Sequence, residues 1–242
     1  MTLESETRIR EAVRERYAKL ASGSVTGCGC SCGSSMQGEA TNEAELLRAG
    51  CGHPVAEAGM KPGEMVLDLG SGAGADAFQA SKLVGPSGKV IGIDVTPEMV
   101  WKARDLATKY GVENVEFRLG EIEHLPLESE LIDLAVSNCV LNLLPDKLLG
   151  FREIFRVLKP GGRIRISDLV TSNPVPKGRV RAEAWAACVE GAIPETEYLQ
   201  LLKQAGFQEV HAADEAACGD GCCSSASNGL RSIAITGIKP TL

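Results

Sequence analysis

The sequence lacks any apolar run of the roughly 20 residues that a membrane-spanning helix requires. Aromatic side chains make up only 4% of its 242 residues, and basic side chains are in the minority. The formal net charge of −7 disfavours nucleic acid, whose phosphates would be repelled. Residues 1–20 form a charged amphipathic pattern without the apolar core of a signal peptide. We therefore expect a cytoplasmic protein that binds neither nucleic acid nor membrane.

Cysteine, by contrast, occurs nine times. An odd number disfavours a framework made only of structural disulfides, and reduced thiols in a cytoplasmic enzyme indicate metal, metalloid or redox chemistry. Neither of the two dense cysteine clusters has the Cys-x-x-Cys spacing that is typical of a structural zinc site. The nine residues are Cys28, Cys30, Cys32, Cys51, Cys139, Cys188, Cys218, Cys222 and Cys223.

Short apolar runs alternate with helix-length amphipathic stretches from residue 64 onward, which indicates a parallel sheet covered by helices. The expected strands are residues 64–69, 89–94, 114–119, 131–137, 162–168, 207–212 and 230–238. The expected helices are residues 1–22, 75–84, 97–110, 146–158, 179–190 and 195–205, with a short one near 42–49.

A glycine-rich turn follows the first expected strand of the sheet. Gly70, Gly72 and Gly74 permit a tight turn and a close approach of the backbone to a ligand at the start of a helix. Asp68 precedes them, and its carboxylate would repel the pyrophosphate of a dinucleotide. It suits a cofactor with an amino group and no phosphate, such as S-adenosylmethionine. Asp94 ends the second strand, where a carboxylate can accept two hydrogen bonds from a ribose diol.

Four motifs in this order resemble those of the class I, Rossmann-like methyltransferases. They are residues 68–74 (DLGSGAG), 92–99 (GIDVTPEM), 120–126 (GEIEHLP) and 158–162 (LKPGG). The resemblance implies an α/β fold with a mostly parallel seven-stranded sheet, helices on both faces and an antiparallel last strand. It also implies S-adenosylmethionine as the cofactor.

The same resemblance assigns cofactor-binding roles within these motifs. Asp94 would bind the ribose, and Val95 and Met99 would flank the adenine. Glu121 and Ile122 would meet the adenine edge, with other positions near the methionine part. Core packing of Met99 and Ile122, and helix capping by Asp94, remain alternatives. The full set is Asp68, Gly70, Ser71, Gly72, Gly74, Asp94, Val95, Met99, Glu121, Ile122 and Asn138.

Three isolated cysteines occur where the methyl group of that cofactor should lie. Cys139 follows the fourth strand, and ligands of α/β sheets bind at the carboxyl ends of the strands. Cys51 lies in a loop before the first strand, and Cys188 lies in the helix after the fifth. Their surroundings, residues 49–54 (AGCGHP), 137–140 (SNCV) and 188–192 (CVEGA), resemble those of arsenite methyltransferases. This resemblance implies that the three cysteines are catalytic and bind arsenic.

Trivalent arsenic is soft and pyramidal, and thiolates are the soft ligands that a protein can offer. Three sulfurs would fill its three bonds and leave the lone pair free to attack the methyl group of S-adenosylmethionine. We expect arsenite, or its thiol conjugates, to be methylated to methylarsenite and, if a second transfer follows, to dimethylarsenite. Thioredoxin or glutathione is the expected reductant.

The resemblance divides the chain into three regions. Residues 1–50 would hold an N-terminal helix and a flexible Cys-rich segment, and residues 51–170 would form the S-adenosylmethionine-binding domain. Residues 171–242 would form an arsenic-binding helical lid and the final strands, with a second Cys-rich insert between those strands. Six cysteines in these outer regions could capture arsenite, bind zinc or have no role.

Alternative functions remain open. An organic acceptor such as a quinone or a sterol would make the cysteines incidental, although the low aromatic content argues against an apolar pocket. A protein that only sequesters a metalloid or zinc would have no need of Asp68 and the glycine turn. Asp68 also disfavours a nicotinamide-dependent oxidoreductase, because that cofactor carries a pyrophosphate.

Overall fold

The computed structural model describes residues 3–24, 43–44, 47, 50, 52–174, 181–215 and 229–241. The predictions made for Cys28, Cys30, Cys32, Cys51, Cys218, Cys222 and Cys223 fall outside the described residues. Within the described ranges, no helix combines the length and the apolar character needed to cross a membrane.

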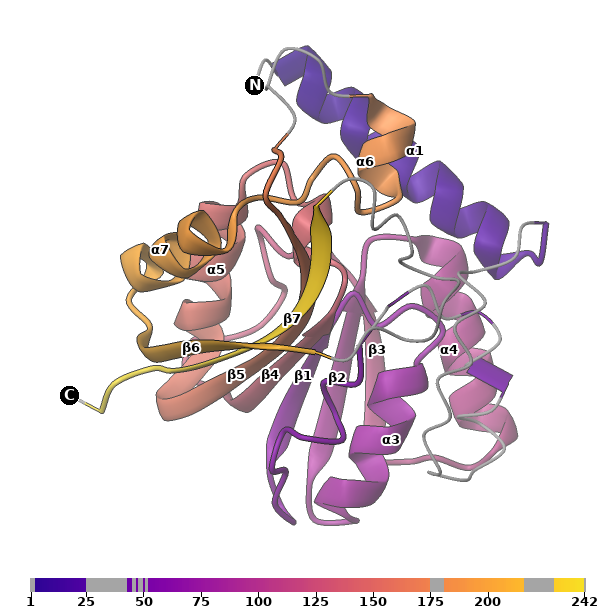
Figure 1. Cartoon of the computed structure of the whole chain (residues 1–242). Helices are drawn as coiled ribbons and strands as arrows, with labels where there is room; N and C mark the ends of the chain where they lie inside the picture. The colour runs from indigo at the N-terminus through magenta and orange to yellow at the C-terminus, as the bar shows by residue number, and fades with distance from the viewer. Residues whose placement is uncertain are drawn as a thin grey trace.

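Seven strands form one sheet, namely β1 (Met65–Leu69), β2 (Lys89–Asp94), β3 (Val115–Leu119), β4 (Ile132–Asn138), β5 (Leu158–Thr171), β6 (Gln208–Asp214) and β7 (Leu230–Ile238). Their order across the sheet is β3-β2-β1-β4-β5-β7-β6 (Figure 1). The first five strands are parallel, whereas β7 is antiparallel to both β5 and β6. The α/β class and the antiparallel last strand expected from the sequence are confirmed.

Helices cover both faces of the sheet and the edge where the parallel strands end (Figure 1). One face carries α3 (Ala75–Val84) and α4 (Pro97–Lys109), and the other carries α5 (Lys147–Val157) and α7 (Glu195–Ala205). Above the carboxyl ends of the strands lie α1 (Leu3–Ala21), α6 (Ala182–Ala186) and the short 3-10 helix η1 (Leu141–Leu143). Figure 1 shows α1 and α6 side by side there.

Side chains alternate between the two faces of each strand, so every central strand contributes to two apolar layers. In β1, Leu67 and Leu69 belong to the layer under α5 and α7, whereas Val66 belongs to the layer under α3 and α4. Each layer contains a pair of packed aromatic rings. The rings of Phe151 and Tyr198 lie 5.3 Å apart in the first layer, and those of Phe78 and Phe117 lie 5.6 Å apart in the second. Burial on both faces explains why these strands are almost wholly apolar.

Two elements differ from their expected bounds. β5 begins at Leu158 instead of residue 162, because pairing with β4 starts before the Lys-Pro-Gly-Gly turn and shifts register between Ile132 and Leu134. The helix expected over residues 179–190 is only five residues long, Ala182–Ala186. Cys188 has a φ of 63°, a left-handed backbone conformation that cannot continue an α-helix.

Candidate functional site

The glycine turn is held on the end of the neighbouring strand. The amides of Gly70 and Ser71 both donate to the Ile93 carbonyl, at 2.8 and 3.0 Å. Gly70 has a φ of 67°, and a Cβ atom there would lie 2.4 Å from Cγ2 of Val140. A side chain at this position would therefore be strained and would also collide with the loop that follows β4. The turn brings the backbone to the carboxyl ends of β1, β2 and β4.

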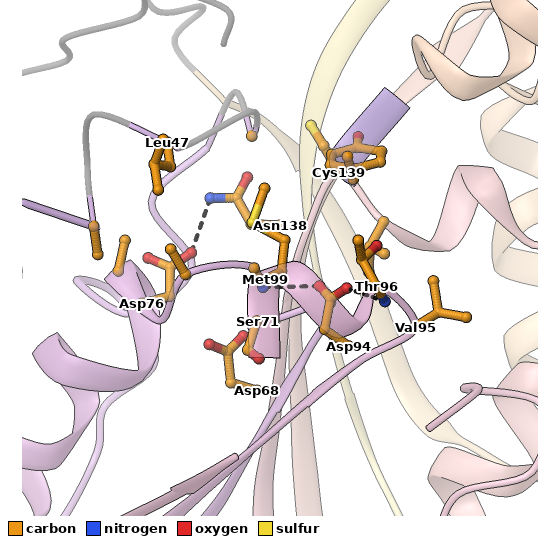
Figure 2. Close-up of a pocket in the computed structure, with 18 of the residues that line it drawn as sticks. Leu47, Asp68, Ser71, Asp76, Asp94, Val95, Thr96, Met99, Asn138 and Cys139 are labelled. Carbon is orange, nitrogen blue, oxygen red and sulfur yellow. Dashed lines mark hydrogen bonds between the residues drawn. The ribbon is translucent and has the colours of Figure 1, made fainter. Parts of the chain in front are cut away.

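Asp94 stands at the end of β2 with both carboxylate oxygens engaged (Figure 2). One oxygen accepts the Gly72 amide at 2.9 Å, and the other accepts the Thr96 amide at 2.8 Å. Burial raises the pKa of the Asp94 carboxyl above its ordinary value, and these two amides oppose the shift by stabilising the anion. The carboxylate is thus fixed in one orientation on the wall of a cavity.

Two adjoining cavities open at the carboxyl ends of these strands. They gather all the positions expected to bind the cofactor except Gly74, where a Cβ atom would lie 2.7 Å from the Phe117 ring. The first cavity is lined by Asp68, Gly70, Ser71, Gly72, Asp94, Val95, Met99, Asn138 and Cys139, among others (Figure 2). The second is lined by Gly70, Asp94, Val95, Glu121 and Ile122, together with Arg10 and Val13 of α1.

Asn138 binds the loop that precedes β1. Its Oδ1 accepts the Gly52 amide at 3.1 Å, and its Nδ2 donates to the Gly52 carbonyl at 2.8 Å. The same Nδ2 donates to Asp76 Oδ2 at 3.0 Å, the contact drawn between these two side chains in Figure 2. A Cβ atom at Gly50 would lie 2.4 Å from Asn138 Oδ1. Asn138 therefore binds one sequence neighbour of Cys51, Gly52, and lies close to the other, Gly50, although Cys51 itself is outside the described residues.

Cys139 and Cys188 are both buried, with 3% and 6% of their surfaces exposed. The Cys188 thiol donates to the Cys139 carbonyl, with 3.0 Å between Sγ and O. Cys139 has a φ of 56°, and its amide donates to the Ser167 carbonyl at 2.8 Å. Two non-glycine residues in left-handed conformations cost of order 1–3 kcal/mol each, and such strain concentrates at functional sites. The structure thus brings two of the three predicted arsenic ligands together.

A cluster of buried polar side chains, Asp168, Asn142, Tyr198 and Lys147, lies next to the segments that carry these two cysteines. Asp168 is fully buried and accepts hydrogen bonds from the Asn142 side chain at 2.7 Å and from the Tyr198 hydroxyl at 3.1 Å. Burial raises the pKa of Asp168 to about 6. Lys147 donates to the Asn142 carbonyl at 3.1 Å and lies 5.0 Å from the Trp185 ring, and burial lowers its pKa to about 8. The cluster ties η1, which follows Cys139, to α6, which precedes Cys188.

Helix α1 supplies residues that the sequence did not link to the site. Its Arg10 pairs with Glu121 at 3.3 Å and with Glu123 at 2.9 Å, and its Arg14 pairs with Glu121 at 2.8 Å. Tyr17 lines the first cavity, and burial raises its pKa well above the ordinary value. The amphipathic pattern of residues 1–20 predicted a helix with one apolar face, but it gave no indication of what that face covers.

Several known proteins with similar sequences or structures are methyltransferases. Residues 60–206 match a family model described as a methyltransferase domain. The arsenite methyltransferase of Halobacterium salinarum is 45% identical over 84% of this chain, and the human arsenite methyltransferase is 41% identical over 59% of it. The crystal structure of an arsenic(III) S-adenosylmethionine methyltransferase from Chlamydomonas reinhardtii aligns with a TM-score of 0.68 at 32% identity, over 86% of this chain and 72% of that one.

The chain belongs to the arsenic(III) S-adenosylmethionine methyltransferase family. The resemblance drawn from the sequence motifs is therefore confirmed. The chain spans about half the length of the curated relatives it matches, 58% of the Halobacterium protein and 40% of the human one.

S-adenosylmethionine is the cofactor of this methyltransferase fold, and the lining residues fit it. The Ser71 hydroxyl is buried against the first cavity and has no hydrogen-bond partner within the part of the chain that the structure describes. A buried polar atom of this kind indicates a polar ligand. Asp68 and Asp94 place two carboxylates on the same cavity, which suits a molecule with an amino group and a ribose diol and no phosphate. Across the described ranges, no group of three or more His, Cys, Asp or Glu side chains is arranged to hold a metal ion.

Proposed function

We propose that this protein methylates arsenite with S-adenosylmethionine, and that Cys51, Cys139 and Cys188 bind the arsenic. The observation that carries the proposal is the meeting of the three cysteine-bearing segments at the ends of β4 and β5. The Cys188 thiol contacts the Cys139 carbonyl, and Asn138, the residue before Cys139, binds the backbone of Gly52. A generic small-molecule methyltransferase has no need of a cysteine in each of these three segments.

The methyl transfer itself requires little beyond positioning. Bound S-adenosylmethionine supplies an electrophilic methyl group on a sulfonium sulfur, and the lone pair of the substrate arsenic is the nucleophile. Thiolates leave that lone pair free, because they occupy only the three bonds of trivalent arsenic. The nucleophile therefore needs no general base. Cys139 lines the cavity itself, and holding both reactants in contact could lower the barrier by about 7–11 kcal/mol.

Residues of the two cavities would hold the cofactor beside these thiols. We propose that Asp94 binds the ribose diol and that the cavity around Val95, Glu121 and Ile122 takes the adenine. Asp68 would face the methionine part, from the start of the glycine turn. In the same proposal residues 51–170 bind the cofactor and the helical part of residues 171–242 covers the arsenic. Attack by the lone pair would form an As–C bond and raise the arsenic to the pentavalent state, while the cofactor would leave as a neutral thioether. Thioredoxin or glutathione would supply the two electrons that return the arsenic to trivalent methylarsenite, which suits a cytoplasmic location where thiols stay reduced.

Single cysteine variants assayed with two substrates test the proposal. Arsenite has three bonds for thiolates, whereas methylarsenite has two, since carbon occupies the third. Cys139→Ser and Cys188→Ser should lose activity with both substrates, because these two residues contact each other in the part of the chain that the structure describes. Cys51→Ser should lose activity with arsenite and keep much of it with methylarsenite. Initial rates are measured chromatographically with excess reductant.

The control is cofactor affinity, measured by calorimetry, which should be nearly unchanged in all three variants. Normal turnover of arsenite by Cys139→Ser would refute the three-thiol arrangement. Equal losses on both substrates in Cys51→Ser would place Cys51 in the permanent pair. Absence of arsenite methylation by the unaltered protein, together with transfer to a quinone or a sterol, would favour an organic acceptor.

A further inference from the structure

A carboxylate outside the proposed arsenic and cofactor sites holds the other side of the loop that carries Cys51. Glu215 directly follows β6, and its Oε1 accepts the His53 amide at 3.3 Å. The same oxygen accepts the Ser167 hydroxyl at 3.0 Å, and Oε2 lies 3.4 Å from the Ser232 hydroxyl. The His53 amide, two residues after Cys51, is thus connected through one side chain to Ser167 of β5 and Ser232 of β7.

The loop has little freedom between its two sets of contacts. A Cβ atom at Gly52 would lie 2.3 Å from the Ser167 Cβ and 2.7 Å from Glu215 Oε2. On the opposite side, Asn138 forms hydrogen bonds with the backbone amide and carbonyl of Gly52. Gly52 is therefore enclosed by Asn138 on one side and by Ser167 and Glu215 on the other, so the loop can take up this position only without a side chain there.

Ser167 connects this arrangement to the buried thiols. Its carbonyl accepts the Cys139 amide at 2.8 Å, while its hydroxyl donates to Glu215. One residue of β5 therefore fixes the backbone of Cys139 and, through Glu215, the backbone beside Cys51. Loss of the acceptor oxygen of Glu215 would release the His53 backbone from Ser167. It would leave in place the hydrogen bond from Cys188 to Cys139 and the one from Cys139 to Ser167.

We propose that Glu215 is a positioning residue for the first methylation, which fixes the Cys51 loop against the thiols that bind arsenic. The inference rests on the proposed function. It explains why an acceptor oxygen is needed at position 215, since one oxygen accepts both the His53 amide and the Ser167 hydroxyl. Glu215 would raise the rate of arsenite methylation, because arsenite binds three thiolates. It would affect the rate with methylarsenite little, because methylarsenite binds only two.

The test compares Glu215→Ala with Glu215→Gln and Asp214→Ala in the full chain. Glutamine keeps an oxygen that can accept from His53 and Ser167, so it should restore function. Asp214 is the adjacent acidic residue, mostly exposed and paired with Arg231, so its variant removes the same charge without touching the loop. Kinetic constants are measured with arsenite and with methylarsenite, and hydrogen exchange is followed in the peptide that contains Gly52 and His53.

For Glu215→Ala we expect kcat/KM with arsenite to fall about tenfold, which corresponds to about 1.4 kcal/mol, and the value with methylarsenite to stay within about twofold. Exchange at His53 should become faster, whereas Glu215→Gln and Asp214→Ala should resemble the unaltered protein in every measurement. Unchanged exchange in Glu215→Ala, or equal losses with both substrates, would overturn the proposal. If the unaltered protein methylates no arsenical, the proposed function fails, and the exchange data still decide whether Glu215 holds the loop.

Discussion

A methyl group added at Gly191 should separate the two buried thiols. Gly191 follows Cys188 by three residues and is buried against η1. A Cβ atom there would lie 2.1 Å from the Asn142 carbonyl oxygen and 3.1 Å from the Trp185 ring, whereas ordinary contact begins at 3.4 Å. The oxygen belongs to backbone that Lys147 also binds, so it cannot turn aside. The segment that carries Cys188 must move by more than about 1 Å, a displacement that can cost about 100-fold in rate.

Initial rates with methylarsenite measure this effect, because that substrate depends on Cys139 and Cys188 alone in the proposed function. Gly191→Ala should reduce kcat/KM by about 100-fold and lower stability by about 1–3 kcal/mol through overpacking. Cofactor affinity by calorimetry should be retained, which also shows that the variant is folded. Gly237→Ala is the control, since its nearest neighbour is the flexible end of Ile164 at 3.3 Å. Unaltered methylarsenite kinetics in Gly191→Ala would refute the reasoning.

Two further variants address the cofactor cavity and the buried cluster. Asp94→Ala should weaken S-adenosylmethionine binding, because hydrogen bonds to a charged group contribute about 1.5–3 kcal/mol each, and calorimetry showing an unaltered dissociation constant would contradict its role. Lys147 has its pKa lowered by burial from 10.5 to about 8, so between these values the unfolded chain binds more protons than the native one. Native stability should therefore rise with pH over that range relative to Lys147→Met. Urea denaturation at about pH 7 and about pH 9.5 measures this rise, which should be about 2 kcal/mol. Parallel pH profiles of the two proteins would contradict the reasoning.

Local patterns were sufficient to predict the individual strands and the glycine turn, whereas the antiparallel last strand was implied by the family resemblance. The strands are short apolar runs bounded by turn residues, and the glycine turn is a single stretch of chain whose backbone requirement is visible in its own residues. Gly70 illustrates this, since its positive φ and its close approach to Val140 both demand glycine. Asp94 was predicted on the same basis, from its place at the end of a strand.

Contacts between distant parts of the chain could not be predicted in this way. Asn138 was expected among the cofactor-binding residues, and its side-chain amide also binds Gly52, 86 residues away in the sequence. Glu121 was expected at the adenine edge, and both of its oxygens pair with arginines of α1, more than 100 residues away. Both residues still line the cavities, so these contacts add to their predicted roles without deciding them. The sequence around a polar side chain does not indicate which distant residue it will bind.

Helix α1 contacts both the apolar cluster of the two buried cysteines and the cavity proposed for adenine. Ile9 and Val13 pack in the same apolar cluster as Cys139 and Cys188, while Arg10, on the same helix, borders the cavity proposed for adenine. The ion pairs that hold the helix are unequal, because the Glu123 side chain is only 2% exposed and that of Arg14 is 48% exposed. An exposed ion pair contributes about 0–1 kcal/mol to folding stability, whereas removing the partner of a buried carboxylate strongly destabilises the folded protein. Arg10 therefore stabilises the position of α1 more than Arg14 does, and this one helix lies over both the two buried cysteines and the cavity proposed for adenine.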